Sequence, residues 1–113
     1  METEWEPKSL SRERTFQDDL RRTEAIPEMI ARLADEVAED LKNEGYRTAN
    51  ITLKVRFATF RTLTRSRTLE TATDDRDTLT QIALGLLDRV TIDRPIRLLG
   101  VRAAKLSQVT PPE

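Results

Sequence analysis

The spacing of apolar residues changes abruptly at Gly45, and this change limits the folds that the chain can adopt. Before Gly45, apolar residues recur every three or four positions from Ile26 to Leu41, which is the period of an amphipathic helix with one buried stripe. After Gly45, apolar and polar residues alternate from Ile51 to Phe57, which is the period of a half-buried strand. A helix followed directly by a strand is therefore predicted at the centre of the chain.

Three further strands and a second helix complete the pattern. Residues 8–16, residues 61–69 and residues 96–104 are predicted strands. The second helix starts after Thr73, where aspartates favour the positive end of the helix dipole, and its apolar stripe runs from Leu79 to Val90. The predicted order is βαββαβ. Because each helix has a single apolar stripe, both should cover the same face of one sheet, which predicts an α+β two-layer sandwich with one open sheet face.

Charge is segregated along the chain, although the formal net charge is only -1. Residues 24–44 are mostly acidic among their charged positions, with Arg32 and Lys42 as the only bases. Residues 45–69 contain no acid and the following bases: Arg47, Lys54, Arg56, Arg61, Arg65 and Arg67. A segregated basic surface attracts polyanions even when the whole chain is nearly neutral. The pattern is typical of a nucleic-acid-binding module.

Strand periodicity indicates which of these bases face the open side. If the apolar residues of the strand at 51–57 are buried, Thr52, Lys54 and Arg56 point outward. We interpret them as a phosphate-facing surface rather than an ordinary solvated face, because no acid balances them between residues 45 and 69. In residues 61–69 the arginines alternate in phase with leucines, and the hydroxyl residues take the other phase. The sequence therefore does not decide which of the two sets points to the open side of the sheet.

The last predicted strand raises a similar question. Arg97 and Arg102 are five residues apart and would face opposite ways in an ideal strand. Gly100 lies between them. It either hosts a bulge that brings both arginines to one side or lets a helix pack closely.

Several classes of protein are disfavoured by what the sequence lacks. With no His and no Cys, the chain has neither the commonest general base nor any thiolate. The start of a helix explains the cluster Asp74, Asp75 and Asp77 better than a metal site does. No apolar run approaches the length of a membrane span, and the absence of a signal pattern predicts a cytoplasmic setting. Few aromatic residues fall in the strands, which argues against a reader of single-stranded RNA.

Four stretches resemble one family, in the family's own order. Residues 8–16, KSLSRERTF, resemble the KSxSxExTF stretch that opens the little-finger domain of Y-family translesion DNA polymerases of the DNA polymerase IV type. LKVRF at 53–57, TRSRTL at 64–69 and PIRLLGVR at 95–102 continue the match. The resemblance covers about residues 6–106 and agrees with the βαββαβ order.

The resemblance implies a domain that grips the primer-template duplex with its open sheet face in the major groove, through phosphate contacts. Residues of the first strand would approach a template-strand phosphate, partly through backbone N–H groups, and several arginines match phosphate-binding positions of the family. With the outward bases of residues 51–57, the predicted DNA-binding set is Lys8, Ser9, Ser11, Lys54, Arg56, Arg65, Arg67, Arg97 and Arg102.

The resemblance also places nucleotidyl transfer, and the Mg²⁺ that it needs, in other domains of a parent polymerase. No catalytic residue, metal or cofactor is therefore expected here. Residues 1–7 are expected to be a linker remnant, residues 8–106 the little-finger domain and residues 107–113 a flexible tail. We expect a monomer that binds duplex DNA. The alternative is a protein-interaction module, whose acidic first helix or basic sheet docks a partner such as the sliding clamp.

Overall fold

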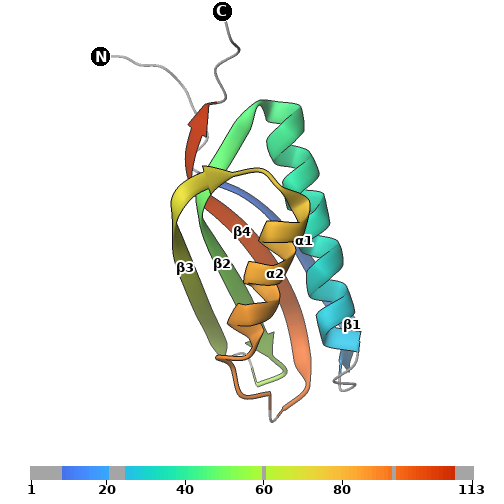
Figure 1. The fold of residues 1–113 in the computed structure, drawn as a ribbon. Helices are drawn as coiled ribbons and strands as arrows, with labels where there is room; N and C mark the ends of the chain where they lie inside the picture. Colours follow the sequence, from blue (N-terminus) through green and yellow to red (C-terminus); the bar gives the residue numbers. More distant parts are fainter. Residues whose placement is uncertain (1–8, 21–24, 60, 93, 109–113) are drawn as a thin grey trace, which may run out of the picture.

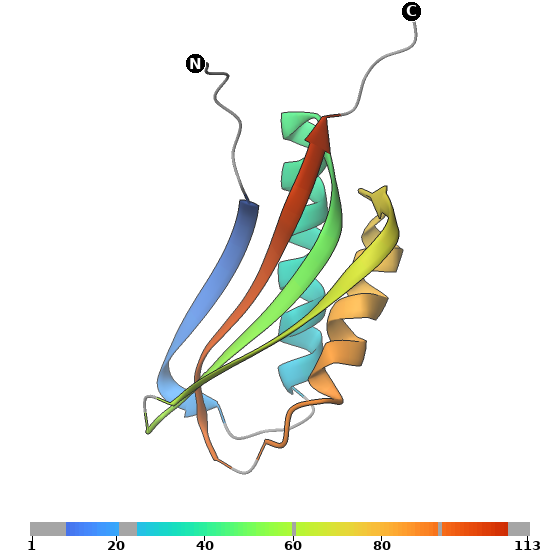
Figure 2. The same cartoon turned by 90° about the vertical axis from the view of Figure 1, so that its left-hand side faces the viewer.

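The computed structural model describes residues 9–20, 25–59, 61–92 and 94–108, with the backbone alone for residues 17–20. Its elements are β1 (Ser9–Leu20), α1 (Ala25–Glu44), β2 (Tyr46–Phe57), β3 (Thr62–Thr73), α2 (Arg76–Leu87) and β4 (Ile96–Gln108) (Figure 1). The strands form one four-stranded antiparallel sheet in the order β1-β4-β2-β3. Both helices lie on the same side of this sheet (Figure 2). The predicted α+β two-layer fold is confirmed.

The two central strands are longer than the alternation of apolar residues indicates. β2 begins at Tyr46, five residues before Ile51, and β4 ends at Gln108. The reason is backbone pairing, since Tyr46 pairs with Gln108 and Arg47 with Ser107. Ser107 and Gln108 therefore belong to β4 and not to the tail expected from residue 107. Ladder hydrogen bonds need no apolar side chain, so a strand can run past the buried part of its face.

The edge strands also exceed their predicted ends. β1 continues through residues 17–20, past the predicted strand end at residue 16, and Leu20 pairs with Ile96 after an irregularity in the register. β3 continues to Thr73, which pairs with Thr48. No helix in the described part of the chain is long and apolar enough to cross a membrane.

The turn from α1 into β2 is made at Gly45, where the spacing of apolar residues changes in the sequence. Gly45 has a φ of 78°, a left-handed conformation that residues with a Cβ rarely adopt. Its N–H donates to the carbonyl oxygen of Lys42 at 3.3 Å and closes the last turn of the helix. Gly45 thus reverses the chain so that β2 runs back along α1.

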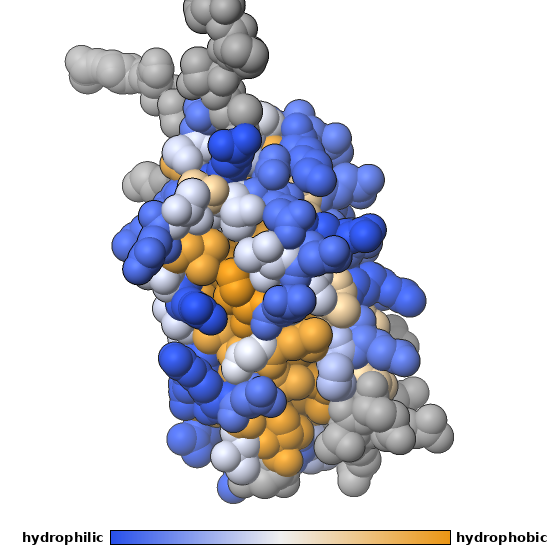
Figure 3. Space-filling view, viewed as in Figure 1, coloured by the Kyte–Doolittle hydropathy of each residue, from blue (hydrophilic) through white to orange (hydrophobic). Residues whose placement is uncertain are grey.

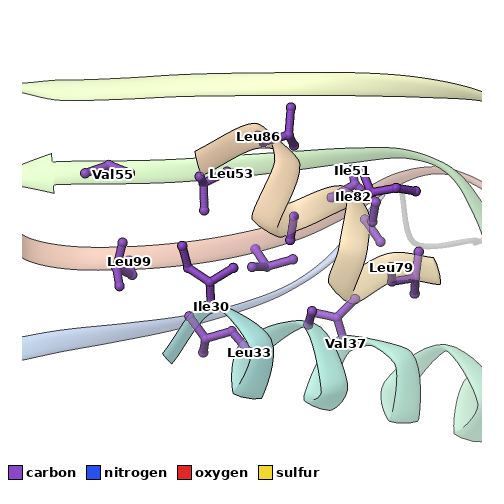
Figure 4. Packing of buried hydrophobic residues seen from close by; sticks show 14 of the residues in the cluster. Ile30, Leu33, Val37, Ile51, Leu53, Val55, Leu79, Ile82, Leu86 and Leu99 are labelled. Atoms are coloured by element: carbon purple, nitrogen blue, oxygen red, sulfur yellow. The ribbon is translucent and has the colours of Figure 1, made fainter. Parts of the chain in front are cut away.

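The core lies between the helices and the inner face of the sheet, as Figure 4 shows. The apolar stripes of both helices meet the alternate residues of β2 and β4 there. Among the fully buried side chains are Ile30 and Leu33 of α1, Leu53 and Val55 of β2, Leu79 of α2 and Leu99 of β4. Burial of these side chains removes a large apolar area from water, and this is the main favourable term for the fold.

Thr48 is a buried polar side chain at the irregularity of β2. Its exposed fraction is 0%, and the register between β2 and β3 shifts between Thr48 and Asn50. The Thr48 hydroxyl lies 2.5 Å from the carbonyl oxygen of Ala104 and 2.9 Å from that of Asn50, and it accepts from the N–H of Asn50 at 3.2 Å. One hydroxyl therefore serves the backbone groups that the bulge takes out of the regular ladder.

Replacement of Thr48 by valine should lower the free energy of unfolding by about 1–3 kcal/mol, because buried backbone groups lose their partner while the shape of the side chain is kept. Urea unfolding followed by circular dichroism measures this loss. Thr64→Val, at an exposed position of β3, is the matched control and should change stability by no more than about 0.5 kcal/mol. Equal losses in the two variants would contradict the role assigned to the Thr48 hydroxyl.

The second helix is apolar around most of its C-terminal half, where residues 82–87 contain no polar side chain. Leu84 and Leu87 are only half-buried, and Leu63 and Leu69 of β3 are half-buried beside the core. Figure 3 shows apolar residues exposed over α2 and toward β3. The helix-covered side is therefore not uniformly polar.

Candidate nucleic-acid interface

The register of the sheet defines the side chains that share the open face. Lys54 of β2 pairs with Thr64 of β3 and with Gly100 of β4, and Gly100 pairs in turn with Glu13 of β1. Residues aligned across a sheet point to the same face. Since Leu53 and Val55, on either side of Lys54, are buried under the helices, this row faces away from them.

A second row lies one step along the strands. Thr52 of β2 pairs with Ser66 and with Arg102, and Arg102 pairs with Ser11 of β1. The neighbouring rows contribute further side chains to the open face, namely Ser9, Asn50, Arg56, Thr62 and Thr68. The structure thus brings together five of the predicted DNA-binding residues: Ser9, Ser11, Lys54, Arg56 and Arg102.

The open face is hydroxyl-rich and slightly hollowed. A depression of about 310 Å³ lies between Lys54, Arg102 and Ser11, and Thr52 and Thr64 also line it. Cationic and hydroxyl side chains are the groups that bind phosphate oxygens in protein–DNA complexes. The threonines and serines of β3 were grouped by phase in the sequence, and only the register shows that their phase is the open one.

Hydrogen bonds between neighbours order parts of this face. Arg56 Nε donates to the hydroxyl of Thr62 at 3.1 Å. The amide of Asn50 is engaged at both ends, since its Nδ2 donates to Thr68 at 3.1 Å and its Oδ1 accepts from Thr52 at 3.2 Å. An amide that is held in this way is not presented for bidentate contact with a base edge.

One acid enters the basic face from a strand that the charge pattern did not include. Glu13 Oε2 lies 3.3 Å from Lys54 Nζ. Residues 45–69 contain no acid, but the sheet adds Glu13 to their face from β1, which is distant in sequence and is separated from β2 only by β4. This exposed ion pair contributes little to stability by itself.

Gly100 has a different role from either of the two predicted ones. The pairing of β4 with β2 is regular at Gly100. The irregularity lies at Arg97 instead, since Arg56 pairs with Leu98 and Phe57 with Ile96, and the register shifts between these two pairs. A Cβ on Gly100 would lie 3.0 Å from Cγ of Glu13. Gly100 therefore makes room for the Glu13 side chain on the open face, and α1 and α2 both pack on the other side of the sheet.

The arginines of β3 do not share the open face. Arg65 pairs with Leu53 and Arg67 with Ile51, so both lie on the helix side of the sheet at its edge. Arg61 precedes the strand and is exposed. The face assignment that the sequence left open is thus settled for Arg65 and Arg67. Arg97 lies at the irregularity of β4 and is half-buried, and Lys8 falls outside the described residues.

The opposite edge of the sheet carries an arginine that is occupied by an acid of α1. Arg12 of β1 donates from Nε to Asp40 Oδ2 at 2.7 Å and from its terminal nitrogen to Oδ1 at 2.9 Å. These hydrogen bonds, with the positive charge of Arg12, lower the pKa of the Asp40 carboxyl below its usual value. Arg12 therefore ties β1 to α1 and is not part of the open face.

The Arg12–Asp40 pair should make stability depend on pH in acid. Because the pKa of Asp40 is lower in the folded state, the stabilisation is fully present above the unfolded-state pKa of about 3.9 and is lost as the pH falls through the folded value. Arg12→Gln should thus be less stable than wild type at neutral pH, and the difference should shrink below about pH 4. Urea unfolding at a series of pH values measures it, with Arg32→Gln on α1 as control. A deficit that is constant with pH would contradict this assignment.

The aspartates before α2 form a helix start, as predicted. Asp75 is the N-cap, and its Oδ2 accepts from the hydroxyl of Thr78 at 2.7 Å and from its N–H at 3.0 Å. These two hydrogen bonds lower the pKa of Asp75. Within the described ranges, no group of three or more acidic side chains is arranged to hold a metal ion.

Comparison with known proteins identifies the family to which this chain belongs. Residues 7–113 match the model of the impB/mucB/samB family C-terminal domain. DNA polymerase IV of Methanoculleus marisnigri is 43% identical over 99 residues, which make up 88% of this chain and 28% of that protein. DNA polymerase IV of Alkalilimnicola ehrlichii is 40% identical over 109 residues, or 94% of this chain and 30% of that protein. The chain thus spans less than a third of the length of these curated relatives.

Solved structures share the fold at lower sequence identity. A post-insertion binary complex of Dbh DNA polymerase has a TM-score of 0.76 at 15% identity, over 90% of this chain and 29% of that one. A complex of the beta-clamp processivity factor and the little finger domain of PolIV contains a chain with a TM-score of 0.66 at 21% identity, over 93% of this chain and 91% of that one.

The two-layer fold with one bare sheet face is shared with the little finger domain of PolIV. The chain belongs to the impB/mucB/samB family, whose C-terminal domain it matches over nearly its whole length. The resemblance to the little-finger domain of DNA polymerase IV is thereby confirmed.

Proposed function

We propose that the open face of the sheet binds duplex DNA through its phosphates and holds a primer-template for a lesion-bypass polymerase. The observation that carries this proposal is the pair of cross-strand rows in which Lys54 and Arg102 lie among serine and threonine hydroxyls, on the side of the sheet opposite to α1 and α2. Arg56 adds a further cation to the same face. Phosphates are largely unchanged by base damage, so a grip of this kind suits synthesis across lesions.

A duplex fits this face better than a single strand. Single-strand binders stack bases on aromatic side chains, and Phe57, the aromatic residue at the end of β2, is buried on the inner side. The amide of Asn50 is held by its neighbours. The face therefore offers charge and hydroxyls without a group placed to distinguish bases, and binding should be independent of sequence.

The proposal extends to the other predicted residues and to the parent protein. Ser9 and Ser11 would contact phosphates at the β1 side of the face, together with Lys8, while Arg67 and Arg97 would reach them from the edge of β3 and from the irregularity of β4. Nucleotidyl transfer, with its Mg²⁺, would be performed by the larger part of the relatives' length that this chain does not span. A cytoplasmic setting and a monomeric state stay predictions.

The direct test is the salt dependence of duplex binding. Fluorescence anisotropy with a labelled duplex of about 20 base pairs should give a dissociation constant of about 10⁻⁴–10⁻⁶ M at physiological salt. If about three to five phosphates are neutralised, log K should fall with log salt at a slope of about -3 to -5. Duplexes of unrelated sequence should bind alike. An affinity that ignores salt, or a preference of orders of magnitude for one sequence, would refute the proposal.

A second candidate is docking of a sliding clamp on the helix-covered side. It is favoured by the half-buried Leu84 and Leu87 of α2, since apolar side chains left at a surface are common where proteins associate. A domain of the same fold is in complex with a beta-clamp in one solved structure. Titration of the chain with a bacterial clamp tests it, and Leu84→Glu should then weaken binding without affecting DNA.

A further inference from the structure

A small hollow on the helix-covered side is lined by arginines from two separate parts of the chain. Its volume is about 200 Å³. Arg61 directly precedes β3 and Arg65 lies within it. Arg89 and Arg94 come from the segment that joins α2 to β4, with Thr91 between them. Arg65 lies on this side because its register partner, Leu53, is buried under the helices.

The floor of the hollow is apolar, since Phe57 and Leu63 also line it. Phe57 is 3% exposed, and Leu63 is half-buried against the core. An apolar floor displaces water and lowers the local dielectric constant, so that charges at the rim interact more strongly than they would in open solvent.

Among the described residues that line the hollow, none is a carboxylate. Elsewhere in the described part of the chain, Arg12, Lys54 and Arg76 each have an acid within 4 Å. No carboxylate of the described residues forms an ion pair with Arg61, Arg65 or Arg89. Arg65 instead donates to the carbonyl oxygen of Thr64 at 2.8 Å. Like charges held together repel one another unless an anion lies between them.

The dipole of α2 accounts for only one of these arginines. α2 ends at Leu87 and is capped by Asp88, and a cation that follows a helix C-terminus is stabilised by the last carbonyl groups. Arg89 is in that position. The dipole gives no reason for Arg61 and Arg65 to line the same hollow.

We propose that this hollow is an anion site that takes a phosphate group. Guanidinium groups bind phosphate oxygens through paired hydrogen bonds, and a tetrahedral anion accepts from several of them at once. The Thr91 hydroxyl supplies a neutral donor of the kind found beside phosphates. The volume is below that of pockets for larger organic ligands, which occupy about 300–1,000 Å³.

The phosphate has two possible sources. One is the backbone of a DNA strand, because β3 is an edge strand and a duplex on the open face would extend past that edge toward Arg61 and Arg65. This source rests on the function proposed above. The other is a free anion such as inorganic pyrophosphate, which does not depend on DNA binding at all.

The site is tested first with inorganic pyrophosphate and the isotope-labelled 113-residue chain. Backbone amides of residues 61–65 and 89–92 should shift on titration. Arg61→Ala with Arg89→Ala should weaken binding by about tenfold or more, because two donors of the site are removed. Arg32→Ala with Arg76→Ala removes the same charge elsewhere and should change the affinity by less than about twofold. All four residues are exposed, and circular dichroism checks that the variants fold.

Three results would overturn the site: no binding up to about 10 mM pyrophosphate, equal loss in the two double variants, or shifts spread evenly over the arginines of the whole domain. A duplex then identifies the source. If the duplex displaces pyrophosphate and Arg61→Ala with Arg89→Ala weakens duplex binding about fivefold, strand phosphates occupy the site. If the duplex binds the variant as well as wild type, a free anion is the ligand, and the site itself stands.

The two proposals fail independently of each other. If Arg61→Ala with Arg89→Ala abolishes pyrophosphate binding, the anion site is supported. If duplex binding still depends on Arg102 in that variant, the open-face function is supported separately. A chain that binds pyrophosphate in the hollow but no duplex at all refutes the open-face function alone. A chain that binds the duplex but no pyrophosphate refutes the anion site alone.

Discussion

Reversal of Arg56 and Arg102 to glutamate should weaken duplex binding by about a hundredfold or more. Both residues lie on the open face, Arg56 in β2 and Arg102 in β4, and each reversal replaces an attraction to phosphate by a repulsion. A loss of about tenfold per site corresponds to about 1.4 kcal/mol for each contact. The salt slope should also become shallower by about 2, since two fewer phosphates are neutralised. Anisotropy at several salt concentrations measures both quantities.

The fold should survive this change, because Arg102 is exposed and Arg56 makes only a hydrogen bond to Thr62 on the surface. The matched control is Arg32→Glu with Arg76→Glu, which alters the net charge equally on the helix side. It should reduce affinity only slightly. If both double variants lost binding to the same extent, net charge rather than the open face would govern the interaction with DNA.

The largest effect on stability should come from Leu53→Ala. Leu53 is 0% exposed in a central strand, and it faces both helices across the core (Figure 4). Truncation of a buried leucine typically costs about 2–5 kcal/mol, through lost transfer free energy and the cavity that is left. A domain of this size has a total stability of about 5–15 kcal/mol, so the variant should lose a large part of it.

Urea unfolding of Leu53→Ala and Leu84→Ala side by side checks this expectation. Leu84 is the same residue type but half-buried on α2, so less apolar area is lost and no closed cavity forms. Leu53→Met keeps the volume and should cost less than about 1.5 kcal/mol. A greater loss at Leu84 than at Leu53 would mean that the centre of the core has been misplaced.

The helices, the buried half of β2 and the two-layer fold could be predicted because each depends on a local period. The stripe from Ile26 to Leu41 and the alternation from Ile51 to Phe57 already contain the information about which side is buried. Gly45 could be placed for a similar reason, since a left-handed turn after a helix has a narrow choice of residues.

The face of β3 could not be predicted, because an edge strand buries little on either side. Arg65 and Thr64 are both polar. The alternate positions that include Arg65 contain leucines as well as arginines, so neither side of the strand can be recognised as the apolar one from the sequence. Only the pairing of Arg65 with Leu53 fixes the orientation. The result divides the predicted DNA-binding residues into those of the open face and those at the edge of the helix side.

The position of Glu13 was missed for a different physical reason. Glu13 lies more than forty residues from Lys54 in the sequence. β1 and β2 lie on either side of β4 in the sheet, and Gly100 of β4, which has no side chain, leaves the space in which Glu13 and Lys54 meet. A charge count along the chain cannot detect neighbours that are created by strand order. The sequence offered one signal. In a strand, Glu13 points to the side opposite to its neighbours Arg12 and Arg14, which is the side of Ser9 and Ser11.

The order β1-β4-β2-β3 also bears on how the domain is made in the cell. The last strand of the sequence occupies an inner position, between β1 and β2. During synthesis, β2 and β3 can pair as a hairpin early, but β1 has no neighbour until residues 96–108 have left the ribosome. Sheet completion must therefore wait for the final strand to be inserted between two others, a non-local step of the kind that slows folding.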